Sequence, residues 1–414
     1  MEYLFIAGNN KAIMKHIVIV GGGFAGVFAA RGLLKRSDVK VTLISKKNYF
    51  LFFPMLHEVA TGGLSGHNLA EPYRNLLHGE NFDFVKDEVT DIDFKKKSVR
   101  CKNCVHKYDY LVMCTGSMTN FFGTKGAEEH CFTLKSLEDA FRLKNHVIRM
   151  VEAAFLAKDE KEHLTSVAIV GAGPTGVELS IEMQEFLEQM CKSNARFKGH
   201  PKVYLIQRGD RVIPQIPLLQ KEAEKRLHKH NIHVLTNSAV TEVQRGKVIV
   251  EGGKSIDAAT IIWTAGVKPR LIQTVPDVAG GKTFKVNEFL QIPEYKDVFV
   301  IGDCSSYTQN GEKSPIPALA QTASEEGKHV SKNLGRLLDK KELIPFKFNL
   351  KGQFITLGKG YGAGFIGKIK LRGFFAWWLN RTIYLFKIFG TGNKLKTAWE
   401  WTLNLFTKRD ACEH

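Results

Sequence analysis

The hydrophobic pattern of the chain repeats one arrangement twice. A short apolar run at residues 16–20 ends in a glycine-rich turn, and a helical pattern and a second apolar run at 39–44 follow. The same order recurs with apolar runs at 167–170 and 203–206. Short apolar runs bounded by turns are typical of buried strands, and longer periodic segments are typical of helices. The pattern therefore predicts an α/β fold in which a strand–turn–helix–strand unit occurs twice.

Both turns carry the glycine spacing G-x-G-x-x-G. The glycines are Gly21, Gly23 and Gly26 in the first turn and Gly171, Gly173 and Gly176 in the second. In this spacing the first glycine allows a tight turn, the second lets the backbone approach a pyrophosphate, and the third lets the helix pack close to the strand. The start of the helix then offers unpaired N–H groups and a partial positive charge to the phosphates. We therefore predict two Rossmann-like dinucleotide-binding domains.

Three further apolar runs end at residues that suit a nucleotide site. The run at 298–301 leads to Gly302 and Asp303, and this carboxylate suits a hydrogen bond to a flavin ribityl hydroxyl. A capping aspartate in a turn is the alternative. The other two runs, at 111–113 and 261–263, are followed by Thr115 and Gly116 and by Thr264, Ala265 and Gly266. We expect these glycine breaks to lie where the two domains meet.

Composition narrows the class of protein. The 414 residues suit two to three domains, and 44% hydrophobic with 24% charged residues is typical of a globular protein. The formal net charge of +17 calls for an anionic partner, which is nucleic acid, an acidic substrate or a membrane surface. No stretch reaches the about 18 uncharged apolar residues of a membrane-spanning helix. Residues 1–10 lack a secretory signal, so we expect a cytoplasmic protein in which 1–13 are an upstream extension or a misassigned start before Met14.

The seven cysteines are scattered and do not form the framework of a secreted, disulfide-rich protein. Cys101 and Cys104 form a C-x-x-C in which Lys102 and Asn103, between two strand-like runs, predict a hairpin turn. A redox pair or half of a zinc site is the alternative interpretation.

Several segments resemble those of one family of flavoproteins. Over residues 17 to about 406 the chain resembles the type II, non-proton-pumping NADH:quinone oxidoreductases, which have two dinucleotide-binding domains. The segments that carry the resemblance are NYFLF at 48–52, EVATG at 58–62, GPTGVE at 173–178, WTAGV at 263–267, IGDC at 301–304 and AQTA at 320–323. The glycine motifs alone specify only the superfamily, whereas WTAG and AQxA narrow it to this family.

The resemblance implies one non-covalently bound FAD and NADH or NADPH as co-substrate. FAD would lie against Gly21, Gly23, Phe24, Ala25, Gly26, Ser45, Lys46, Thr115, Gly116, Gly302, Asp303, Ala320 and Gln321. The pyridine nucleotide would lie against Gly171, Gly173, Gly176, Glu178, Gln207, Ala265 and Gly266.

Three residues are implied by the resemblance to take part in catalysis. Glu178 corresponds to a glutamate linked to hydride transfer, and Gln321 to a glutamine that lines the quinone pocket beside the flavin. Glu325 stands where the family usually has a second glutamine, on the same helical face as Gln321, where it could relay a proton or be a tolerated change. The alternatives are a helix-forming glutamate at 178 and a buried structural amide at 321.

Two positions depart from the usual nucleotide-binding pattern. An acid about 20 residues beyond the glycines normally binds the ribose hydroxyls. Ser45, followed by Lys46, takes this place in the first unit, and Gln207, followed by Arg208 and Arg211, takes it in the second. Glutamine does not repel a 2′-phosphate and the arginines could pair with one, which favours acceptance of NADPH. The alternative is that Gln207 merely replaces glutamate as the ribose acceptor.

The C-terminal segment has the composition of a helix at a membrane surface. Four of the five tryptophans lie beyond residue 370, and a helical projection of 395–406 gathers its leucine and aromatic side chains on one broad arc. Residues 368–414 hold nine basic and three acidic side chains. This combination is typical of an interfacial helix on an anionic lipid surface. A core-facing or dimer-forming helix pair is the alternative, and both can coexist in a homodimer.

We therefore predict an α/β fold with two Rossmann-like domains and a C-terminal amphipathic-helix membrane-anchoring region. The predicted limits are 14–120 and 276–345 for the two segments of the FAD domain, 121–275 for the NAD(P)H domain and 346–414 for the membrane-associated quinone region. The predicted function is hydride transfer from NAD(P)H to FAD and reduction of a membrane quinone to quinol, without proton pumping. The protein would attach peripherally to the cytoplasmic face of the cell membrane.

Two other functions fit parts of the pattern. A sulfide:quinone oxidoreductase would need a cysteine pair near the flavin, for which Cys131 and Cys304 are the candidates by position. A basic flavin-containing binding protein would use the positive charge for nucleic acid. No nucleic-acid-binding module is recognisable, so we expect no nucleic-acid partner.

Overall fold

The computed structural model of the chain describes residues 14–157, 162–195 and 197–413, and the predicted extension at 1–13 lies outside them. The chain forms two compact units. Unit 1 holds the residues up to 50, 72–117 and 269–349, and unit 2 holds 51–71, 118–268 and 350–414. Four short strands fall at these limits: β3 (Tyr49–Leu51), β4 (Ala70–Pro72), β10 (Ser117–Thr119) and β18 (Val267–Pro269). The predicted domain limits concern what each part binds, and they stay a prediction.

Unit 1 is built on a six-stranded sheet in the order β21–β22–β9–β1–β2–β5, in which every neighbouring pair is parallel except β21 with β22. Its strands are β1 (Lys15–Val20), β2 (Val39–Ser45), β5 (Phe82–Lys86), β9 (Tyr110–Met113), β21 (Gln291–Ile292) and β22 (Tyr295–Val300). A second sheet has the order β19 (Gln273–Val275), β6 (Val89–Asp93), β7 (Ser98–Cys101) and β8 (Val105–Lys107), and β20 (Phe284–Lys285) pairs with β23 (Ser305–Ser306). The helical elements are α1 (Phe24–Leu33), α3 (Tyr73–Leu76), η5 (Gly302–Cys304) and α8 (Ala320–Leu338).

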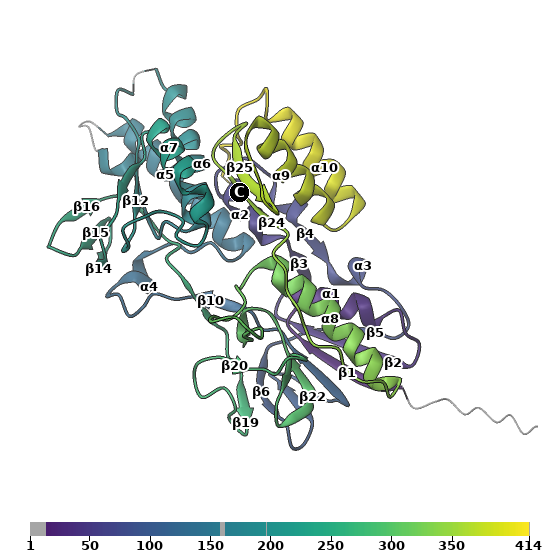
Figure 1. Ribbon diagram of the computed structural model, residues 1–414. Coiled ribbons are helices and arrows are strands. Elements are labelled where there is room, and N and C mark those ends of the chain that lie inside the picture. Colours follow the sequence, from purple (N-terminus) through teal and green to yellow (C-terminus); the bar gives the residue numbers. More distant parts are fainter. Residues whose placement is uncertain (1–13, 158–161, 196, 414) are drawn as a thin grey trace, which may run out of the picture. The chain divides into compact units, whose positions relative to one another are not determined.

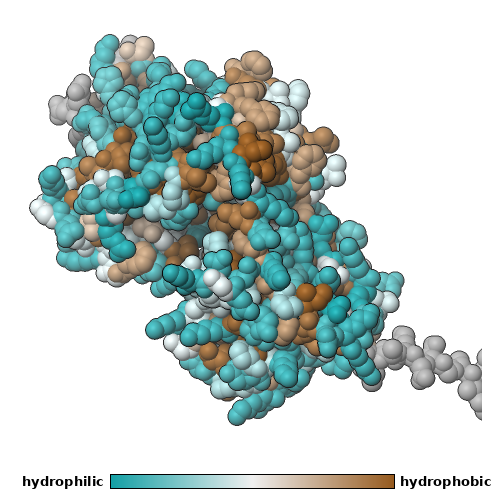
Figure 2. Space-filling view, viewed as in Figure 1, coloured by the Kyte–Doolittle hydropathy of each residue, from teal (hydrophilic) through white to brown (hydrophobic). Residues whose placement is uncertain are grey.

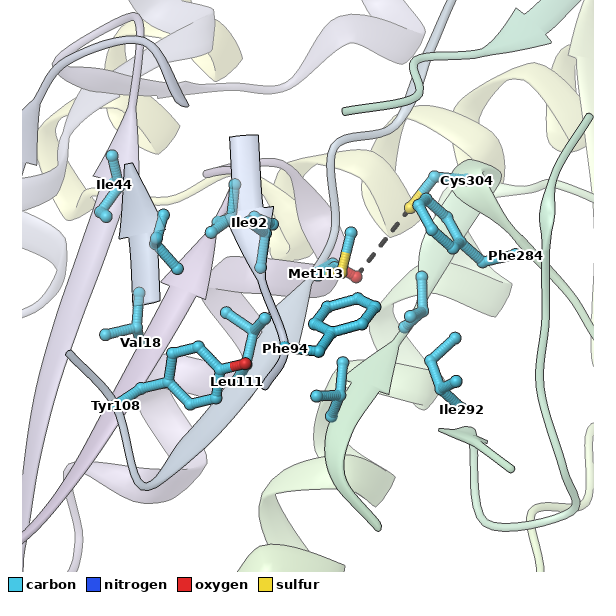
Figure 3. Packing of buried hydrophobic residues seen from close by; sticks show 14 of the residues in the cluster. Val18, Ile44, Ile92, Phe94, Tyr108, Leu111, Met113, Phe284, Ile292 and Cys304 are labelled. Atoms are coloured by element: carbon cyan, nitrogen blue, oxygen red, sulfur yellow. Dashed lines mark hydrogen bonds between the residues drawn. The ribbon is translucent and has the colours of Figure 1, made fainter. Parts of the chain in front are cut away.

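The core of unit 1 lies between its two larger sheets. Side chains alternate along a strand, so Val18 and Val20 point to the same face of the main sheet. There they pack with Ile92, which lies in β6, and with Phe94, which follows β6. The same buried cluster includes Phe284 (Figure 3). This packing fixes the end of β1, which leads into the first glycine turn, and the end of β9, which leads to Thr115 and Gly116.

Helices α1 and α8 lie side by side along unit 1 (Figure 1). Small residues allow this close packing, because a Cβ on Gly327 would come within 2.3 Å of the Ala25 carbonyl oxygen. A Cβ on Gly32 would likewise meet the Ser331 hydroxyl at 2.1 Å. The start of α8 is thereby held beside the start of α1.

Unit 2 contains a four-stranded parallel sheet in the order β13–β12–β11–β17. Its strands are β11 (Ser166–Val170), β12 (Lys202–Ile206), β13 (His233–Leu235) and β17 (Thr260–Trp263), and an antiparallel sheet joins β14 (Val240–Gln244), β15 (Lys247–Val250) and β16 (Ser255–Asp257). The helical elements up to residue 229 are η1 (Phe53–Met55), α2 (Leu56–Ala60), η2 (Gly66–Leu69), α4 (Ala127–His130), α5 (Leu137–Leu156), η3 (Glu162–Thr165), α6 (Pro174–Ser193), η4 (Pro217–Leu219) and α7 (Gln220–Lys229). The predicted α/β class with two nucleotide-binding folds is confirmed.

The C-terminal part of unit 2 is an antiparallel sheet followed by two helices. The strands are β24 (Gly352–Thr356), β25 (Gly362–Ile366) and β26 (Ile369–Gly373), and the helices are α9 (Phe374–Lys387) and α10 (Thr391–Leu403). Within the described residues, no helix combines the length and apolar character needed to cross a membrane.

Helix α10 turns its polar arc towards the protein. Glu400 accepts a hydrogen bond from the Ser65 backbone N–H at 2.9 Å, and Asn404, just beyond the helix, donates one to the Gly63 carbonyl at 2.6 Å. Of the predicted apolar arc, Trp401 is buried, whereas Leu395 and Trp399 are 68% and 65% exposed. Most of the apolar arc therefore faces away from unit 2.

Candidate functional site

The first glycine turn of unit 1 brings backbone segments closer than a side chain would allow. Gly21 has φ +111°, and a Cβ there would lie 2.2 Å from the Cys114 carbonyl oxygen. A Cβ on Gly26 would lie 2.0 Å from the Gly21 carbonyl oxygen. Both positions therefore require glycine, for the turn and for the close start of α1.

The same turn leaves an open approach to the start of α1. A Cβ on Gly23 would have no described atom within 4 Å, and within the described residues no side chain caps this helix end. Phe24 and Ala25 form its first turn, which contains no acidic residue. Unsatisfied N–H groups and the positive end of the helix dipole suit a pyrophosphate here.

Asp303 belongs to the second segment of unit 1 and lies in η5, just after β22. Its Oδ2 accepts a hydrogen bond from the Ser117 hydroxyl at 2.7 Å. Gly302, with φ +73°, donates its N–H to Glu326 Oε2 at 2.6 Å. Thr115 and Gly116 are anchored to Arg270, since the Thr115 hydroxyl donates to the Arg270 carbonyl and the Arg270 N–H donates to the Gly116 carbonyl.

Helix α8 begins at Ala320 and presents the predicted quinone-pocket glutamine. The Nε2 of Gln321 is buried, and among the described atoms it has no hydrogen-bond partner. Glu325, one turn further, is 35% exposed and accepts a hydrogen bond from Lys328 at 3.1 Å. A buried amide group without a partner is costly and suits a ligand that accepts a hydrogen bond.

Glu326, which sequence reasoning missed, is the buried carboxyl of this helix. It is 3% exposed, and burial raises its pKa to about 7, although the hydrogen bond from the Gly302 N–H acts to lower this pKa. Its position could have been found from the spacing of Ala323, Glu326 and Val330, which places all three on the buried face of α8.

At the ribose position of unit 1, Ser45 ends β2. The neighbouring Lys46 forms an ion pair with Glu88, which Lys102 also joins at 2.8 Å. The charge of Lys46 is therefore already paired with a carboxylate of the same unit.

The second glycine turn, in unit 2, repeats the construction of the first. Gly171 has φ +106°, and a Cβ there would lie 2.4 Å from the Ala265 Cα. A Cβ on Gly176 would lie 1.9 Å from the Gly171 carbonyl oxygen. Gly173 precedes α6, and Pro174 occupies the first turn, where its missing N–H costs nothing. Gly266 follows and accepts a hydrogen bond from the Asn120 N–H at 3.1 Å.

Gln207 folds back onto this turn. Its Oε1 accepts a hydrogen bond from the Ala172 N–H at 3.1 Å. Arg211 pairs with its neighbour Asp210 at 2.8 Å, whereas Arg208 forms no ion pair with the carboxylates of the described chain. Of the two candidate arginines, Arg208 is therefore the one left for an added anion.

Glu178 is a buried acceptor inside unit 2. Its Oε1 accepts hydrogen bonds from the backbone N–H and the hydroxyl of Thr356, at 2.8 and 3.0 Å. The Thr356 hydroxyl also lies 3.3 Å from His57 Nε2. Burial raises the pKa of Glu178, although His57 and the Thr356 bonds act to lower it. These contacts to a distant strand exclude the interpretation of Glu178 as a mere helix former.

Two further glutamates continue the row on α6. Glu182 and Glu185 both form ion pairs with Arg409, the second at 2.6 Å. Burial acts to raise the pKa of Glu182, but the charges of Arg409, His57 and Arg381 together hold this pKa below its usual value. Arg409 also donates to the Thr61 hydroxyl at 3.0 Å. The C-terminal tail is thus tied to the nucleotide-binding fold of unit 2.

A parallel contact holds α9 and α10. Glu58 Oε2 accepts hydrogen bonds from Arg381 at 3.3 Å and from the Trp401 indole at 3.0 Å. The Arg381 guanidinium lies 4.2 Å from the centre of the Trp377 ring and 4.7 Å from that of a Trp401 ring. These groups and the Arg409 cluster line a cavity of about 360 Å³.

Sequence reasoning missed this buried network, although one signal for it was present. Glu178, Glu182 and Glu185 stand at spacings of four and three, which puts them on one face of α6, and Glu178 and Glu182 are among its buried residues. Arg409, the partner of Glu182 and Glu185, lies more than 200 residues away, and no local pattern connects them.

Comparisons with known proteins agree with this architecture. The model of the pyridine nucleotide-disulphide oxidoreductase family matches residues 15–327. The type II NADH:quinone oxidoreductase NdhA of Mycobacterium tuberculosis is 30% identical over 413 residues, which cover 94% of this chain and 86% of that protein. The fold is similar to that of NDH2 from Plasmodium falciparum in complex with NADH, with a TM-score of 0.87, 21% identity, and 96% and 99% of the two chains covered. The sulfide:quinone oxidoreductase of Aquifex aeolicus has a TM-score of 0.72 at 21% identity, with 95% and 96% covered.

The buried Glu326 makes the stability of the protein depend on pH. Its pKa is about 7 in the fold and 4.5 when exposed, so stability should fall as pH rises from about 4.5 through 7, where the buried group ionises. Glu326→Gln keeps the acceptor for Gly302 and cannot ionise. We expect the variant to match the wild type near pH 4.5 and to exceed it at pH 8 by on the order of 3 kcal/mol in the free energy of urea unfolding. The control Glu325→Gln should change little, and a Glu326→Gln protein less stable than wild type at pH 8 would contradict the assignment.

Proposed function

This chain belongs to the pyridine nucleotide-disulphide oxidoreductase family and, within it, to the type II NADH:quinone oxidoreductases, and we propose that its unit 1 binds FAD and its unit 2 binds NAD(P)H. The observation that carries the proposal is the pair of glycine turns, each at the end of a parallel strand and each leading into a helix. The protein oxidises NADH and reduces a quinone to quinol, without pumping protons.

The residues of unit 1 fit the flavin nucleotide. The open space at Gly23 and the first turn of α1 would receive the pyrophosphate, and Asp303, Thr115 and Gly116 would bind along the ribityl chain and ring. FAD supplies the redox chemistry when it is bound, and the protein positions it and tunes its electronics.

The residues of unit 2 bind and orient the pyridine nucleotide. The turn at Gly173 offers the start of α6 to its pyrophosphate, and Glu178 lies in the second turn of that helix. The two hydrogen bonds from Thr356 fix one oxygen of Glu178 and hold its rotamer. A fixed carboxyl of this kind orients the nicotinamide carboxamide, which lowers the entropic cost of reaching the reactive geometry.

The start of α8 would contact the quinone. The unpaired Nε2 of Gln321 can donate a hydrogen bond to a quinone carbonyl. Quinone reduction to quinol consumes two protons, and NADH brings one hydride, so a proton donor is needed at this end. Glu326 has a pKa of about 7 and lies close to Asp303, so it can both hold and release a proton near neutral pH, and Glu325 would exchange protons with solvent.

The sulfide alternative is not favoured. Cys131 belongs to unit 2 and Cys304 to unit 1, and both are buried free thiols. Burial raises the pKa of Cys131 to about 12, which leaves little of the thiolate that sulfur transfer requires.

The exposed apolar side chains of α9 and α10 form the proposed membrane contact, which we call the C-terminal face. Its members are Phe374, Phe375, Trp378, Phe386, Leu395, Trp399, Leu403, Leu405 and Phe406, each at least 38% exposed. Figure 2 shows apolar side chains gathered over these helices. Such a face with lysines around it suits the anionic, cytoplasmic surface of a membrane, where the quinone is dissolved. A homodimer contact is the competing use of the face.

The assignment of Glu178 is tested by Glu178→Gln. The amide keeps an acceptor for Thr356 but replaces the second carboxyl oxygen by an NH₂ group, so we expect kcat/KM for NADH with a soluble quinone to fall about tenfold or more. Anaerobic NADH should bleach the flavin absorbance of the wild-type protein, and sulfide should not. The control Glu188→Gln, on the same helix and 37% exposed, should keep full activity. A colourless protein after refolding with FAD, or bleaching by sulfide alone, would contradict the proposed function.

The nucleotide preference is tested by Gln207→Glu. Because Gln207 is uncharged and Arg208 has no carboxylate partner, we expect the wild type to use both NADH and NADPH. A glutamate would repel the 2′-phosphate, so kcat/KM for NADPH should fall at least about tenfold while that for NADH changes by less than about threefold. A wild type that already prefers NADH a thousandfold would refute the NADPH proposal.

The C-terminal face is tested by the double variant Trp399→Glu and Phe406→Glu. Each loses apolar burial on the order of 1.5–3 kcal/mol, so binding to vesicles with anionic lipid should weaken at least about tenfold. The control Leu156→Glu and Leu218→Glu adds the same charge at exposed leucines of unit 2 and should bind normally. Unchanged vesicle binding with loss of a dimer in light scattering would assign the face to self-association instead.

A further inference from the structure

The C-x-x-C of unit 1 forms a compact cluster with a histidine. The Sγ atoms of Cys101 and Cys104 and a ring nitrogen of His106 all lie within 4.8 Å of one another. The Cys104 sulfur is 3.2 Å from His106 Nε2. Cys101 is buried and the other two are half-buried, so the cluster is enclosed but reachable from solvent. It belongs to neither nucleotide turn and to none of the contacts assigned above.

The hairpin of β7 and β8 holds these side chains in place. The predicted hairpin turn is confirmed, because the Cys101 N–H donates to the Cys104 carbonyl at 2.8 Å. Val99 and Cys101 point to the same face of β7, and Val99 pairs across the ladder with His106. The strand pairing therefore sets Cys101 and His106 on one face, and the tight turn brings Cys104 to them.

A carboxylate stands at the edge of the cluster. Asp87 Oδ2 lies 3.5 Å from the Cys104 sulfur and accepts a hydrogen bond from the Asn103 N–H at 3.0 Å. Its Oδ1 accepts from the Glu88 N–H at 2.7 Å. Asp87 thus precedes β6 in a fixed orientation, with one oxygen turned to the sulfur.

We infer that Cys101, Cys104 and His106 bind a thiophilic divalent cation, Zn²⁺ in the first place, with Asp87 as the fourth group. A tetrahedral Zn²⁺ about 2.3 Å from sulfur and about 2.0–2.1 Å from nitrogen needs donor atoms about 3.5–3.8 Å apart. The Cys104 sulfur lies 3.2 Å from His106 Nε2 and 3.5 Å from Asp87 Oδ2, within a few tenths of an ångström of this spacing. The Cys101 sulfur lies within 4.8 Å of the other two ligand atoms. Two thiolates with an imidazole select zinc over the hard cations that prefer oxygen ligands.

A redox-active disulfide is the less suitable use of the pair. Reactive C-x-x-C thiols are activated at helix starts or beside positive charge, which lowers their pKa. Here the motif joins the two strands of a hairpin, and no helix begins at it. The bound ion would instead cross-link the β7–β8 hairpin to the segment before β6, and so fix the end of the second sheet of unit 1.

The experiment uses the full-length, untagged, FAD-containing protein, reduced and freed of metal by a chelator. Titration with Co²⁺ should produce the long-wavelength visible bands of tetrahedral cobalt thiolate, which lie to the red of the flavin absorbance. The intensity of these bands should stop rising at one equivalent of Co²⁺ per chain. Zn²⁺ should then displace Co²⁺ and abolish the bands. Because Cys101→Ser alters the core, the main variants are Cys104→Ser and His106→Gln, each with its flavin content measured as a check of folding.

Both variants should bind Co²⁺ at least about a hundredfold more weakly, and Asp87→Asn about tenfold more weakly. Cys412→Ser, which changes the exposed cysteine, should bind as the wild type does. Reduced wild-type protein without the cobalt bands, or equal binding by folded Cys104→Ser, would overturn the proposal. A Cys101–Cys104 disulfide found by mass spectrometry together with absent metal binding would assign the pair to redox chemistry.

Discussion

The structure depends on the approach of one backbone segment to another at a distance that no side chain permits. At Gly26 and Gly176 a Cβ would lie about 2 Å from the carbonyl oxygen of the preceding turn, so each helix begins directly against its strand. This contact determines where the helix start points, and the helix start is what attracts a dinucleotide phosphate. Both units solve the same steric problem in the same way. A chain that uses two such turns has two nucleotide sites before any side chain contributes specificity.

The side chains around each turn then make the two units chemically different, chiefly through the surroundings of their buried carboxyl groups. Glu178, Glu182 and Glu326 are all carboxyls removed from water, yet their environments differ. The charges of Arg409, His57 and Arg381 hold the pKa of Glu182 below its usual value, whereas burial raises the pKa of Glu326 to about 7. Removing Arg409 would leave buried charge uncompensated, a change that typically costs about 3–5 kcal/mol. The same fold therefore favours the ionised form of one buried carboxyl and raises the pKa of another to about neutral pH.

The features that the sequence predicted well are those encoded within a short stretch. The glycine turns, the strands around them and the hairpin at Lys102 and Asn103 follow from local spacing. The partners of Glu178 did not, because Thr356 lies 178 residues away and only the folded chain brings them together. The buried carboxyl of α8, Glu326, was not predicted, since the family pattern and not the burial of Ala323 and Val330 guided the choice of residues on this helix. Local rules thus predicted the turns and the elements around them, and tertiary packing decided which side chains are buried beside them.

The outward turn of α10 follows from how the C-terminal charges are used. Arg381 and Arg409 form ion pairs with glutamates inside unit 2, and Glu400 accepts a hydrogen bond from the Ser65 N–H. The polar side of α10 therefore faces the rest of unit 2. Apolar Trp399 has no place in that buried interface and faces solvent. The lysines that remain, such as Lys394 and Lys396, surround the apolar face and are each worth about 1 kcal/mol near an anionic surface. Salt screens these exposed lysines far more than the buried arginines, so we expect the proposed lipid attachment and the integrity of the fold to respond separately to ionic strength.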